Sequence, residues 1–219
     1  MKKIIKLALA TSSLIIFSTV LTPVSNAAPN KSLEKINCKN TKAKGHTVKN
    51  VLPPEVKAPF KNRTLSFATN CGDITIEAYG ASAPIAVTTM LSLARNGYFN
   101  ETLCHRLTTN EIYLLHCGDP TATGMGQLSF EYDNENLPKS IENNYPAGTV
   151  GIWNSEVISN GSQFFIVYED SSLPPSYTIW GKVTKGLDIV RAIAKDGVVN
   201  GKSDGSPKRK IAIERVKVR

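Results

Sequence analysis

The side chains with the clearest chemical potential lie in three short stretches. They read CHRL…CGD over residues 104–119, NGSQFFI over 160–166 and YTIWGKV over 177–183. Within the first stretch, Arg106 is charged at every physiological pH and holds its five N–H donors in a rigid fork. Such a group suits a reaction in which a lone pair or a negative charge develops on a bound substrate.

Short apolar runs separated by turns indicate that these stretches lie on β-strands. Residues 64–69 and 74–79 alternate apolar and polar side chains around a tight turn at 70–73, which predicts a β-hairpin. Further short apolar runs follow at 112–115, 149–153, 164–167, 178–180 and 211–218. Many short strands with few helices favour a mainly β protein whose antiparallel sheet closes as a barrel.

Two segments have helical periodicity instead. Pro84 suits the first turn of a helix, apolar residues recur at a spacing of three to four over 87–94, and Gly97 suits the position just past the end. A second amphipathic run covers Leu187–Asp196 and stops at Gly197. We therefore expect helices at 84–96 and 187–196.

The N-terminus has the pattern of a secretory signal peptide. Three lysines precede a short apolar run, and Ser25-Asn26-Ala27 places small residues before a cleavage point after Ala27. An uncleaved membrane anchor is the alternative, although the run is short for a span and Thr11–Ser13 interrupts it. The pattern predicts a signal peptide at 1–27 and a secreted or cell-surface protein.

The positive charge of the chain is concentrated just after this segment. The formal net charge is +8, and residues 28–63 alone hold nine Lys and Arg against Glu34 and Glu55. This Lys-, Asn- and Pro-rich stretch is expected to be a basic flexible linker before a domain at 64–219. It is either a solvated spacer or a contact to anionic lipids or acidic wall polymers. The domain has no basic stripe, which argues against nucleic acid as a partner.

Four cysteines follow the predicted cleavage point: Cys38, Cys71, Cys104 and Cys117. An even count in an exported protein suggests disulfides, and the spacings fit no zinc site. A hairpin folded near residues 110–111 would bring Cys104 and Cys117 opposite each other, within the reach of a disulfide. Cys38 would then pair with Cys71. The alternative is four buried free thiols, because a register error of one residue would separate the first pair.

The order and spacing of the three stretches resemble those of the cyclophilins, and the CGDP tetrapeptide resembles exported actinobacterial members. The resemblance covers residues 64–218. It implies a mainly β fold, a closed eight-stranded antiparallel barrel capped by two α-helices. It also implies peptidyl-prolyl cis-trans isomerase activity on Pro-containing polypeptides, with no metal or other cofactor.

This activity fits an arginine on chemical grounds. An X–Pro bond resists rotation because the nitrogen lone pair is conjugated with the carbonyl, and the barrier is about 18–20 kcal/mol. A donor aimed at the proline nitrogen removes this conjugation without breaking a bond. Each 1.36 kcal/mol taken off the barrier is about tenfold in rate.

The resemblance assigns roles residue by residue. Arg106 corresponds to the catalytic arginine, Gln163 to the glutamine that positions it, and Phe165 to the floor of the proline pocket. The remaining substrate-binding positions are Tyr113, Leu114, Leu173 and Tyr177 around the proline ring and Asn154, whose backbone grips the peptide.

The sequence also departs from the family pattern. His116 replaces a glutamine hydrogen-bonded to the arginine; as part of the catalytic group it could accept from the arginine when neutral, and it would repel it when protonated. We therefore expect activity to decrease as the pH is lowered through about 6–7. Trp153 and Ser155 replace small residues, which would narrow the groove, and Gln127 replaces a glycine. Ser172 replaces a tryptophan that contacts cyclosporin, so we expect weak cyclosporin binding.

The sequence thus predicts an exported prolyl isomerase that assists folding of exported proteins. The departures keep one alternative open, a non-catalytic cyclophilin-like module that binds Pro-containing segments as a chaperone. A third interpretation is a wall-attached scaffold that uses the basic segment.

Overall fold

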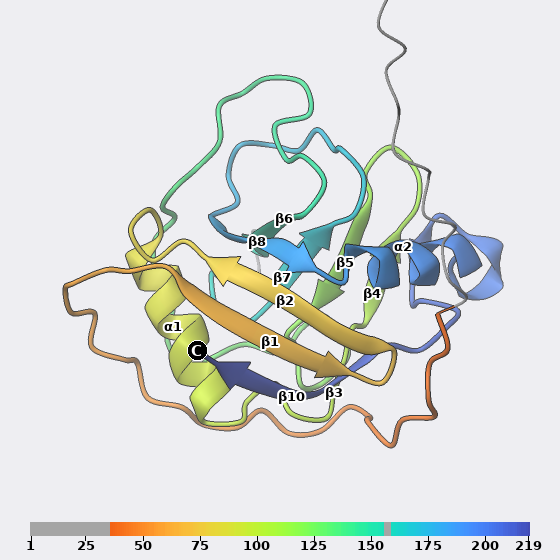
Figure 1. Ribbon diagram of the computed structural model, residues 1–219, viewed down its shortest axis with the longest axis horizontal. Helices are drawn as coiled ribbons and strands as arrows, with labels where there is room; N and C mark the ends of the chain where they lie inside the picture. Colours follow the sequence, from red (N-terminus) through yellow and green to blue (C-terminus); the bar gives the residue numbers. More distant parts are fainter. Residues whose placement is uncertain (1–35, 156–158) are drawn as a thin grey trace, which may run out of the picture. The chain divides into compact units, whose positions relative to one another are not determined.

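The computed structural model describes residues 36–155 and 159–219, so the predicted signal peptide lies outside the described residues. It is mainly β, with two α-helices (Figure 1). The helices are α1 (Pro84–Arg95) and α2 (Leu187–Asp196), and a 3-10 turn, η1, covers Val199–Gly201. The strands are β1 (Arg63–Thr69), β2 (Gly72–Ala78), β3 (Thr102–Leu103), β4 (Arg106–Thr108), β5 (Leu114–Cys117), β6 (Thr149–Ile152), β7 (Phe164–Val167), β8 (Ile179–Lys185), β9 (Asp204–Gly205) and β10 (Ala212–Val218).

The strands form one curled antiparallel sheet of ten strands, in the order β3-β10-β1-β2-β8-β6-β7-β5-β4-β9. The mainly β class is confirmed, whereas the closed eight-stranded barrel is not matched. β3 pairs with β10 and β4 pairs with β5, but Cys104 and His105 separate β3 from β4. A single continuous strand in place of β3 and β4 would pair with both β10 and β5 and so close the sheet. The break between β3 and β4 interrupts this pairing, and β9 adds a short strand on the outer side of β4.

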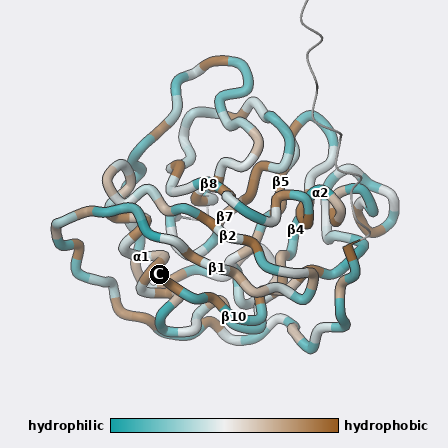
Figure 2. Tube along the Cα trace, in the orientation of Figure 1, coloured by the Kyte–Doolittle hydropathy of each residue, from teal (hydrophilic) through white to brown (hydrophobic). Residues whose placement is uncertain are grey.

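The predicted hairpin is formed by β1 and β2. Leu65 faces Ile76 and Phe67 faces Ile74 across the pair, and all four side chains are buried. Their polar neighbours in the chain point to the other face, as the alternation requires. Hydrophobic residues concentrate on the strands and hydrophilic ones on most outer loops (Figure 2).

Both helices lie where the sequence placed them and cover parts of the sheet. α1 begins at Pro84, buries Met90 and Leu93 completely and packs against β10. α2 buries Ile189, Val190 and Ile193 and packs against β2. In the part of the chain that the structure describes, neither helix has the length and apolarity needed to cross a membrane.

Strands β5 and β7 have a buried side chain at every position, but on two different faces. Leu115 and Cys117 lie in the large hydrophobic core, which we call the core cluster. Leu114 belongs to a second group, the site cluster, and so does Phe165, which faces His116 across the strand pair. The site cluster contains Leu114, Tyr145, Phe165 and Val167, with Ile112, Trp153, Leu173, Tyr177 and Ile179 packed against them.

Residues 36–62, the basic strap, have no helix or strand but lie along the domain (Figure 1). The backbone N–H of Lys39 donates to the Asn70 carbonyl at 2.8 Å, and that of His46 donates to the Pro120 carbonyl at 2.9 Å. Val51 is buried in the core cluster. The structure thus differs from the free linker that the sequence predicted, because backbone hydrogen bonds and apolar contacts hold this segment on the fold.

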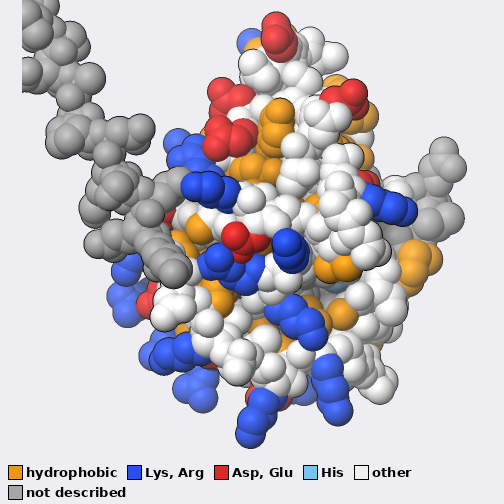
Figure 3. All heavy atoms as spheres, turned by 90° about the vertical axis from the view of Figure 1, so that its right-hand side faces the viewer, with side chains coloured by type: hydrophobic (Ala, Val, Ile, Leu, Met, Phe, Trp, Pro, Cys, Tyr) orange, Lys and Arg blue, Asp and Glu red, His pale blue; other side chains and the backbone are white. Residues whose placement is uncertain are grey.

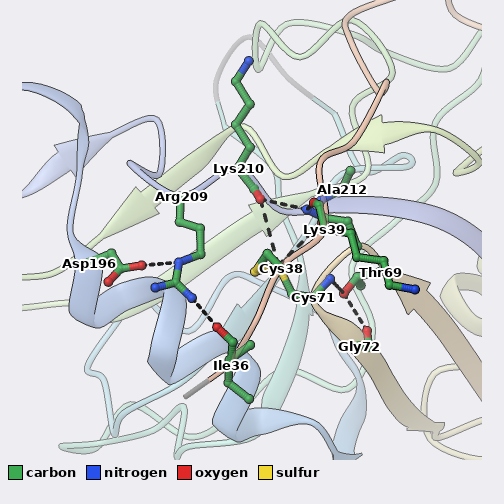
Figure 4. The surroundings of a disulfide bond; sticks show 11 residues. Ile36, Cys38, Lys39, Thr69, Cys71, Gly72, Asp196, Arg209, Lys210 and Ala212 are labelled. Carbon is green, nitrogen blue, oxygen red and sulfur yellow. Dashed lines mark hydrogen bonds and ion pairs between the residues drawn. A yellow bond between two sulfur atoms is a disulfide. The ribbon is translucent and has the colours of Figure 1, made fainter. Parts of the chain in front are cut away.

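Two disulfides appear in the described residues, in the pairing that the sequence favoured. Cys38–Cys71 joins the basic strap to the turn between β1 and β2 (Figure 4). The guanidinium of Arg209 secures the same region, since it donates to the Ile36 carbonyl at 2.6 Å and pairs with Asp196. Cys104–Cys117 bridges the chain on either side of the β4–β5 hairpin.

Candidate active site

Arg106 lies at the start of β4, opposite His116 on β5. Its Nε donates to Oδ1 of Asp204 at 2.8 Å, and its Nη2 donates to Oδ2 of the same carboxylate at 2.7 Å. The carbon of its guanidinium lies 5.5 Å from the ring centre of Trp153. About 30% of the Arg106 side chain remains exposed, so the arginine is held on one edge and accessible from solvent.

An aromatic pocket floor lies beside this arginine. Phe165 is fully buried, and its ring lies nearly perpendicular to that of Tyr177 at a centroid distance of 5.5 Å. Trp153 stacks on Tyr177 at 5.3 Å with the ring planes 10° apart. Trp153 and Tyr177 are only half-buried, so flat apolar surface reaches solvent next to a cation. This combination can hold a small apolar ring against a hydrogen-bond donor.

The structure brings together most of the side chains that the resemblance assigned to the pocket. Leu114, Phe165, Leu173 and Tyr177 all belong to the site cluster. Trp153, which the sequence identified as a departure, forms a wall of the same cluster, and Arg106 adjoins it.

Tyr113 is placed elsewhere. It packs against the core cluster, with its ring centre 5.8 Å from that of Tyr168. Alternation explains this, because Leu114 points into the site cluster and its neighbour therefore points away. Ile112, which the sequence analysis did not single out, takes a place in the site cluster instead.

Tyr145 is a pocket residue that sequence reasoning missed. Its ring is fully buried, 6.0 Å from Phe165, and its hydroxyl accepts a hydrogen bond from the Tyr177 N–H at 3.1 Å. The same hydroxyl lies within donor distance of the Tyr177 and Pro174 carbonyls. Burial raises the pKa of Tyr145 to about 12, so it stays a neutral donor that fixes the Tyr177 wall. Tyr145 belongs to none of the three motif stretches, and only the fold brings its loop into contact with Phe165 and Tyr177.

His116 is buried and neutral. Its ring lies 4.7 Å from Trp153 and 5.8 Å from Phe165. Burial lowers the pKa of His116 well below its usual value, and the charges of Arg106 and His105 lower it further. This direction favours the neutral imidazole in the folded protein, which runs against the loss of activity near pH 6–7 that the sequence predicted. Its Nε2 is buried with no hydrogen-bond partner in the described structure.

Gln163 is also buried, but its side-chain amide makes hydrogen bonds to the backbone of a loop. Its Nε2 donates to the carbonyls of Gly124 and Gly126 at 3.0 and 2.9 Å, while its Oε1 has no partner among the described residues. Asp119, at the start of this loop, accepts hydrogen bonds from the N–H groups of Thr121 and Gly124. The glutamine thus supports the turn-rich segment behind Arg106, and no hydrogen bond joins it to the arginine in the described residues.

Asn154 follows Trp153 in the chain, and its side chain makes hydrogen bonds within the protein. Its Nδ2 donates to Asn160 Oδ1 at 2.8 Å and to Asn134 Oδ1 at 3.1 Å. This network ties the loop at 131–134 to the segment that carries Asn154. The contact between the Asn154 backbone and a peptide, which the resemblance implied, stays a prediction.

The site offers no obvious place for a metal ion. Within residues 36–155 and 159–219, no three His, Cys, Asp or Glu side chains gather as a metal-binding group. The described side chains of the site supply hydrogen-bond donors and positive charge beside an aromatic surface.

Comparison with known proteins gives a consistent result. Residues 64–218 match the family model of the cyclophilin type peptidyl-prolyl cis-trans isomerases. The chain is 39% identical over 197 residues to a probable peptidyl-prolyl cis-trans isomerase B of Mycobacterium leprae, with 84% of this chain and 67% of that protein covered. A Mycobacterium tuberculosis protein of the same name is 38% identical over 194 residues, with 82% and 63% covered. The chain thus spans about two thirds of the length of these relatives.

Solved structures agree. A cyclophilin type isomerase of Cryptosporidium parvum superposes with a TM-score of 0.61 at 26% identity, covering 73% of this chain and 98% of that one. A second structure of that protein, determined in the presence of the dipeptide Ala-Pro, gives a TM-score of 0.59. On the family match, the relatives and the fold together, the chain belongs to the cyclophilin type peptidyl-prolyl cis-trans isomerases.

Proposed function

We propose that this chain accelerates rotation about X–Pro bonds in exported polypeptides. The observation that supports it most directly is the placement of Arg106 beside the site cluster, 5.5 Å from Trp153. In this proposal the proline ring rests on Phe165 between Leu114 and Tyr177. A guanidinium N–H then donates to the proline nitrogen as that nitrogen becomes pyramidal.

The geometry suits this reaction because nothing covalent has to form. The aromatic surface holds the ring, while the exposed part of Arg106 supplies a charged donor at the edge of that surface. Charged donors form stronger hydrogen bonds than neutral ones. The peptide carbonyl before proline stays free to swing toward solvent.

Replacement of Arg106 tests the proposal. We expect Arg106→Ala to lower kcat/KM on an X–Pro peptide by about 100-fold, equivalent to about 2.7 kcal/mol of lost transition-state stabilisation. Arg106→Lys should also be poor, because an ammonium does not reproduce the fork. Arg191→Ala is the matched control, since Arg191 also pairs with a surface carboxylate, Glu169.

Circular dichroism and thermal unfolding would show that the variants remain folded. Wild-type turnover by Arg106→Ala would refute the assignment. A wild-type protein that binds Pro-containing peptides without isomerising them would support the non-catalytic alternative.

The export of the protein is part of the proposal. It is supported by the signal-peptide pattern at 1–27 and by two disulfides, which persist mainly in oxidising compartments. Expression of the full chain in a Gram-positive host, followed by fractionation and N-terminal sequencing, tests it. A mature protein beginning at Ala28 outside the membrane is expected, and an intact chain in the cytosol would contradict export.

We also propose that the basic strap contacts an acidic polymer of the cell surface. The strap holds six lysines against Glu55, and the segment is fixed on the domain. Lys42, Lys44, His46 and Lys49 line a surface cavity of about 450 Å³. Lys and Arg side chains also gather along the lower part of the face shown in Figure 3.

Long-chain inorganic polyphosphate is a suitable probe for this surface. Binding should weaken as salt rises, and Lys42→Gln/Lys44→Gln should reduce it more than the control Lys57→Gln/Lys61→Gln, which lies outside the cavity lining. Equal loss in both variants would show a diffuse charge effect. Binding to phosphatidylglycerol vesicles but not to polyphosphate would favour a membrane contact instead.

A further inference from the structure

Asp204 is a second charged residue at the site, and no sequence motif drew attention to it. It lies 98 positions after Arg106 and reaches it through β9. Thr108 pairs with Asp204 and Leu107 pairs with Gly205 in the β4–β9 ladder, and the Thr109 N–H donates to the Ser203 carbonyl at 2.8 Å. The backbone that carries Asp204 is therefore fixed to the strand that carries Arg106.

The contact between the two side chains is bidentate. Both oxygens of Asp204 are used, on the Nε and Nη2 edge of the guanidinium, at 2.8 and 2.7 Å. Two parallel hydrogen bonds fix the plane of an arginine as well as its position. The hydrogen bonds from Arg106 lower the pKa of Asp204, which keeps the carboxylate charged.

This contact leaves free the donors that a substrate would need. The guanidinium has five N–H groups, and the bidentate pair uses one on Nε and one on Nη2. Nη1 lies on the side of the guanidinium opposite the Asp204 edge, with both of its N–H groups unused by the ion pair. The Trp153 ring, a wall of the site cluster, lies 5.5 Å from the guanidinium carbon.

The two groups that the sequence assigned near the arginine do not hold it in the described structure. The Nε2 of Gln163 is bonded to Gly124 and Gly126, and His116 is held neutral by burial without a hydrogen bond to the guanidinium. Asp204 supplies the orienting contact instead.

We propose that Asp204 is a positioning residue, which holds the Arg106 fork so that Nη1 faces the proline site. The inference rests on the proposed isomerase activity. It predicts that the ion pair acts on the transition state, where the orientation of the donor matters, and not on the affinity for the peptide.

A double-mutant cycle on the full mature chain tests this. Asp204→Ala should lower kcat/KM about tenfold, mainly through kcat, and the binding of an X–Pro peptide measured by NMR titration should change less than about twofold. Asp204→Asn keeps one acceptor oxygen and should lose less activity than Asp204→Ala. In the Arg106→Ala background, Asp204→Ala should cause no further loss, because its effect passes through the arginine.

Glu169→Ala is the matched control. Its side chain is 52% exposed, as is that of Asp204, and it pairs with Arg191; neither residue belongs to the site cluster. This control should retain wild-type kcat/KM. Asp204→Asn, which keeps the shape of the side chain, serves if the alanine variant does not fold.

Two results would overturn the inference. Activity equal to or above wild type in Asp204→Ala would mean that the ion pair is neutral or holds the arginine out of use. An equal loss in the wild-type and Arg106→Ala backgrounds would mean that Asp204 acts on structure alone. An active Arg106→Ala variant would instead refute the proposed function itself, so the two failures are distinguishable.

Discussion

Phe164 and Phe165 are neighbours on β7 and both are buried, yet their surroundings differ completely. Phe164 lies in the core cluster, with Phe67, Phe99 and Trp180 rings at centroid distances of 5.6, 6.0 and 5.9 Å. Phe165 lies in the site cluster, where the surrounding rings are Tyr145, Trp153, Tyr177 and His116.

The difference lies in what closes each cluster. Phe67, Phe99 and Trp180 are buried, so the rings around Phe164 on the core side of β7 are all shielded from solvent. On the other face the walls Trp153 and Tyr177 are half-exposed, and Arg106 stands at the edge. One strand thus contributes to stability through one face and offers a binding surface through the other.

The largest expected effect separates the two phenylalanines. Phe164→Ala should lower the free energy of unfolding by about 3–5 kcal/mol, because it leaves a sealed cavity. Phe165→Ala should cost less stability, since its site opens to water, but should lose more kcat/KM per folded molecule. Urea unfolding and isomerisation assays on both variants measure this. Equal stability losses with equal activities would remove the distinction between the faces.

The two disulfides also differ in which part of the molecule they hold. Cys117 follows His116 on β5 and lies on the core face, whereas Cys38–Cys71 holds the basic strap. In the chain-entropy model, each bond contributes about 3–4 kcal/mol. We expect Cys104→Ala/Cys117→Ala to reduce both stability and kcat/KM, and Cys38→Ala/Cys71→Ala to reduce stability alone.

Peptide mapping of the non-reduced protein is the accompanying check. Alkylation of Cys104 and Cys117 without reductant would contradict the pairing. An intact kcat/KM in the Cys104→Ala/Cys117→Ala variant would show that the core face does not order the site face.

The pH response of His116 is a smaller test. Its pKa is lowered on folding, so between the folded value and about 6.5 the unfolded chain binds the extra proton. Stability should therefore fall as pH decreases below about 6.5, by at most about 1.4 kcal/mol per pH unit for this group. His116→Gln should reduce the slope of stability against pH. Part of the slope should remain, because burial also lowers the pKa of His105.

The activity of the wild-type protein should meanwhile stay flat between pH 6 and 7, because the buried imidazole remains neutral. Thermal unfolding and kcat/KM measured across this range decide the point. A drop in activity that disappears in His116→Gln would show that the histidine is protonated in the folded enzyme.

The smallest expected effect concerns the rim of the site cluster. Ser172 is exposed, accepts a hydrogen bond from the Asn143 N–H at 2.9 Å, and precedes Leu173 of the site cluster. We expect weak cyclosporin binding by the wild-type protein and a severalfold gain in Ser172→Trp, because an aromatic ring adds apolar area at the rim. Calorimetric titration measures it, with Ser82→Trp as a control. Tight binding by the wild-type protein would contradict the prediction.

The features that short-range chemistry specifies could be predicted from the chain. The β1–β2 hairpin follows from period-two alternation around a Gly-containing turn, and α1 follows from Pro84 and an apolar stripe. The alternation on β7 also placed Phe164 and Phe165 on opposite faces. The resemblance carried by the three motif stretches singled out Arg106, Leu114, Phe165 and Tyr177, and the structure brings these residues to one part of the sheet.

Other features depend on contacts between distant segments. Asp204 meets Arg106 across 98 residues, and Tyr145 lies beneath the pocket from a separate loop. The charge and proline content of the basic strap suggested a free linker, since such composition shows no core-facing period, but a disulfide and long-range hydrogen bonds hold it in place. The division of β3 from β4 likewise depends on pairing with β10 and β5.

The amino-acid pattern alone predicted the hairpin and the two helices, because each depends on neighbours close in the chain. The three motif stretches and their order were enough to predict the family. The fold decided which group holds the arginine, whether His116 carries a proton and where Tyr113 points. Those outcomes depend on burial and on partners brought together across the sheet, and the free energy of a charge or a hydrogen bond is set by its surroundings in space.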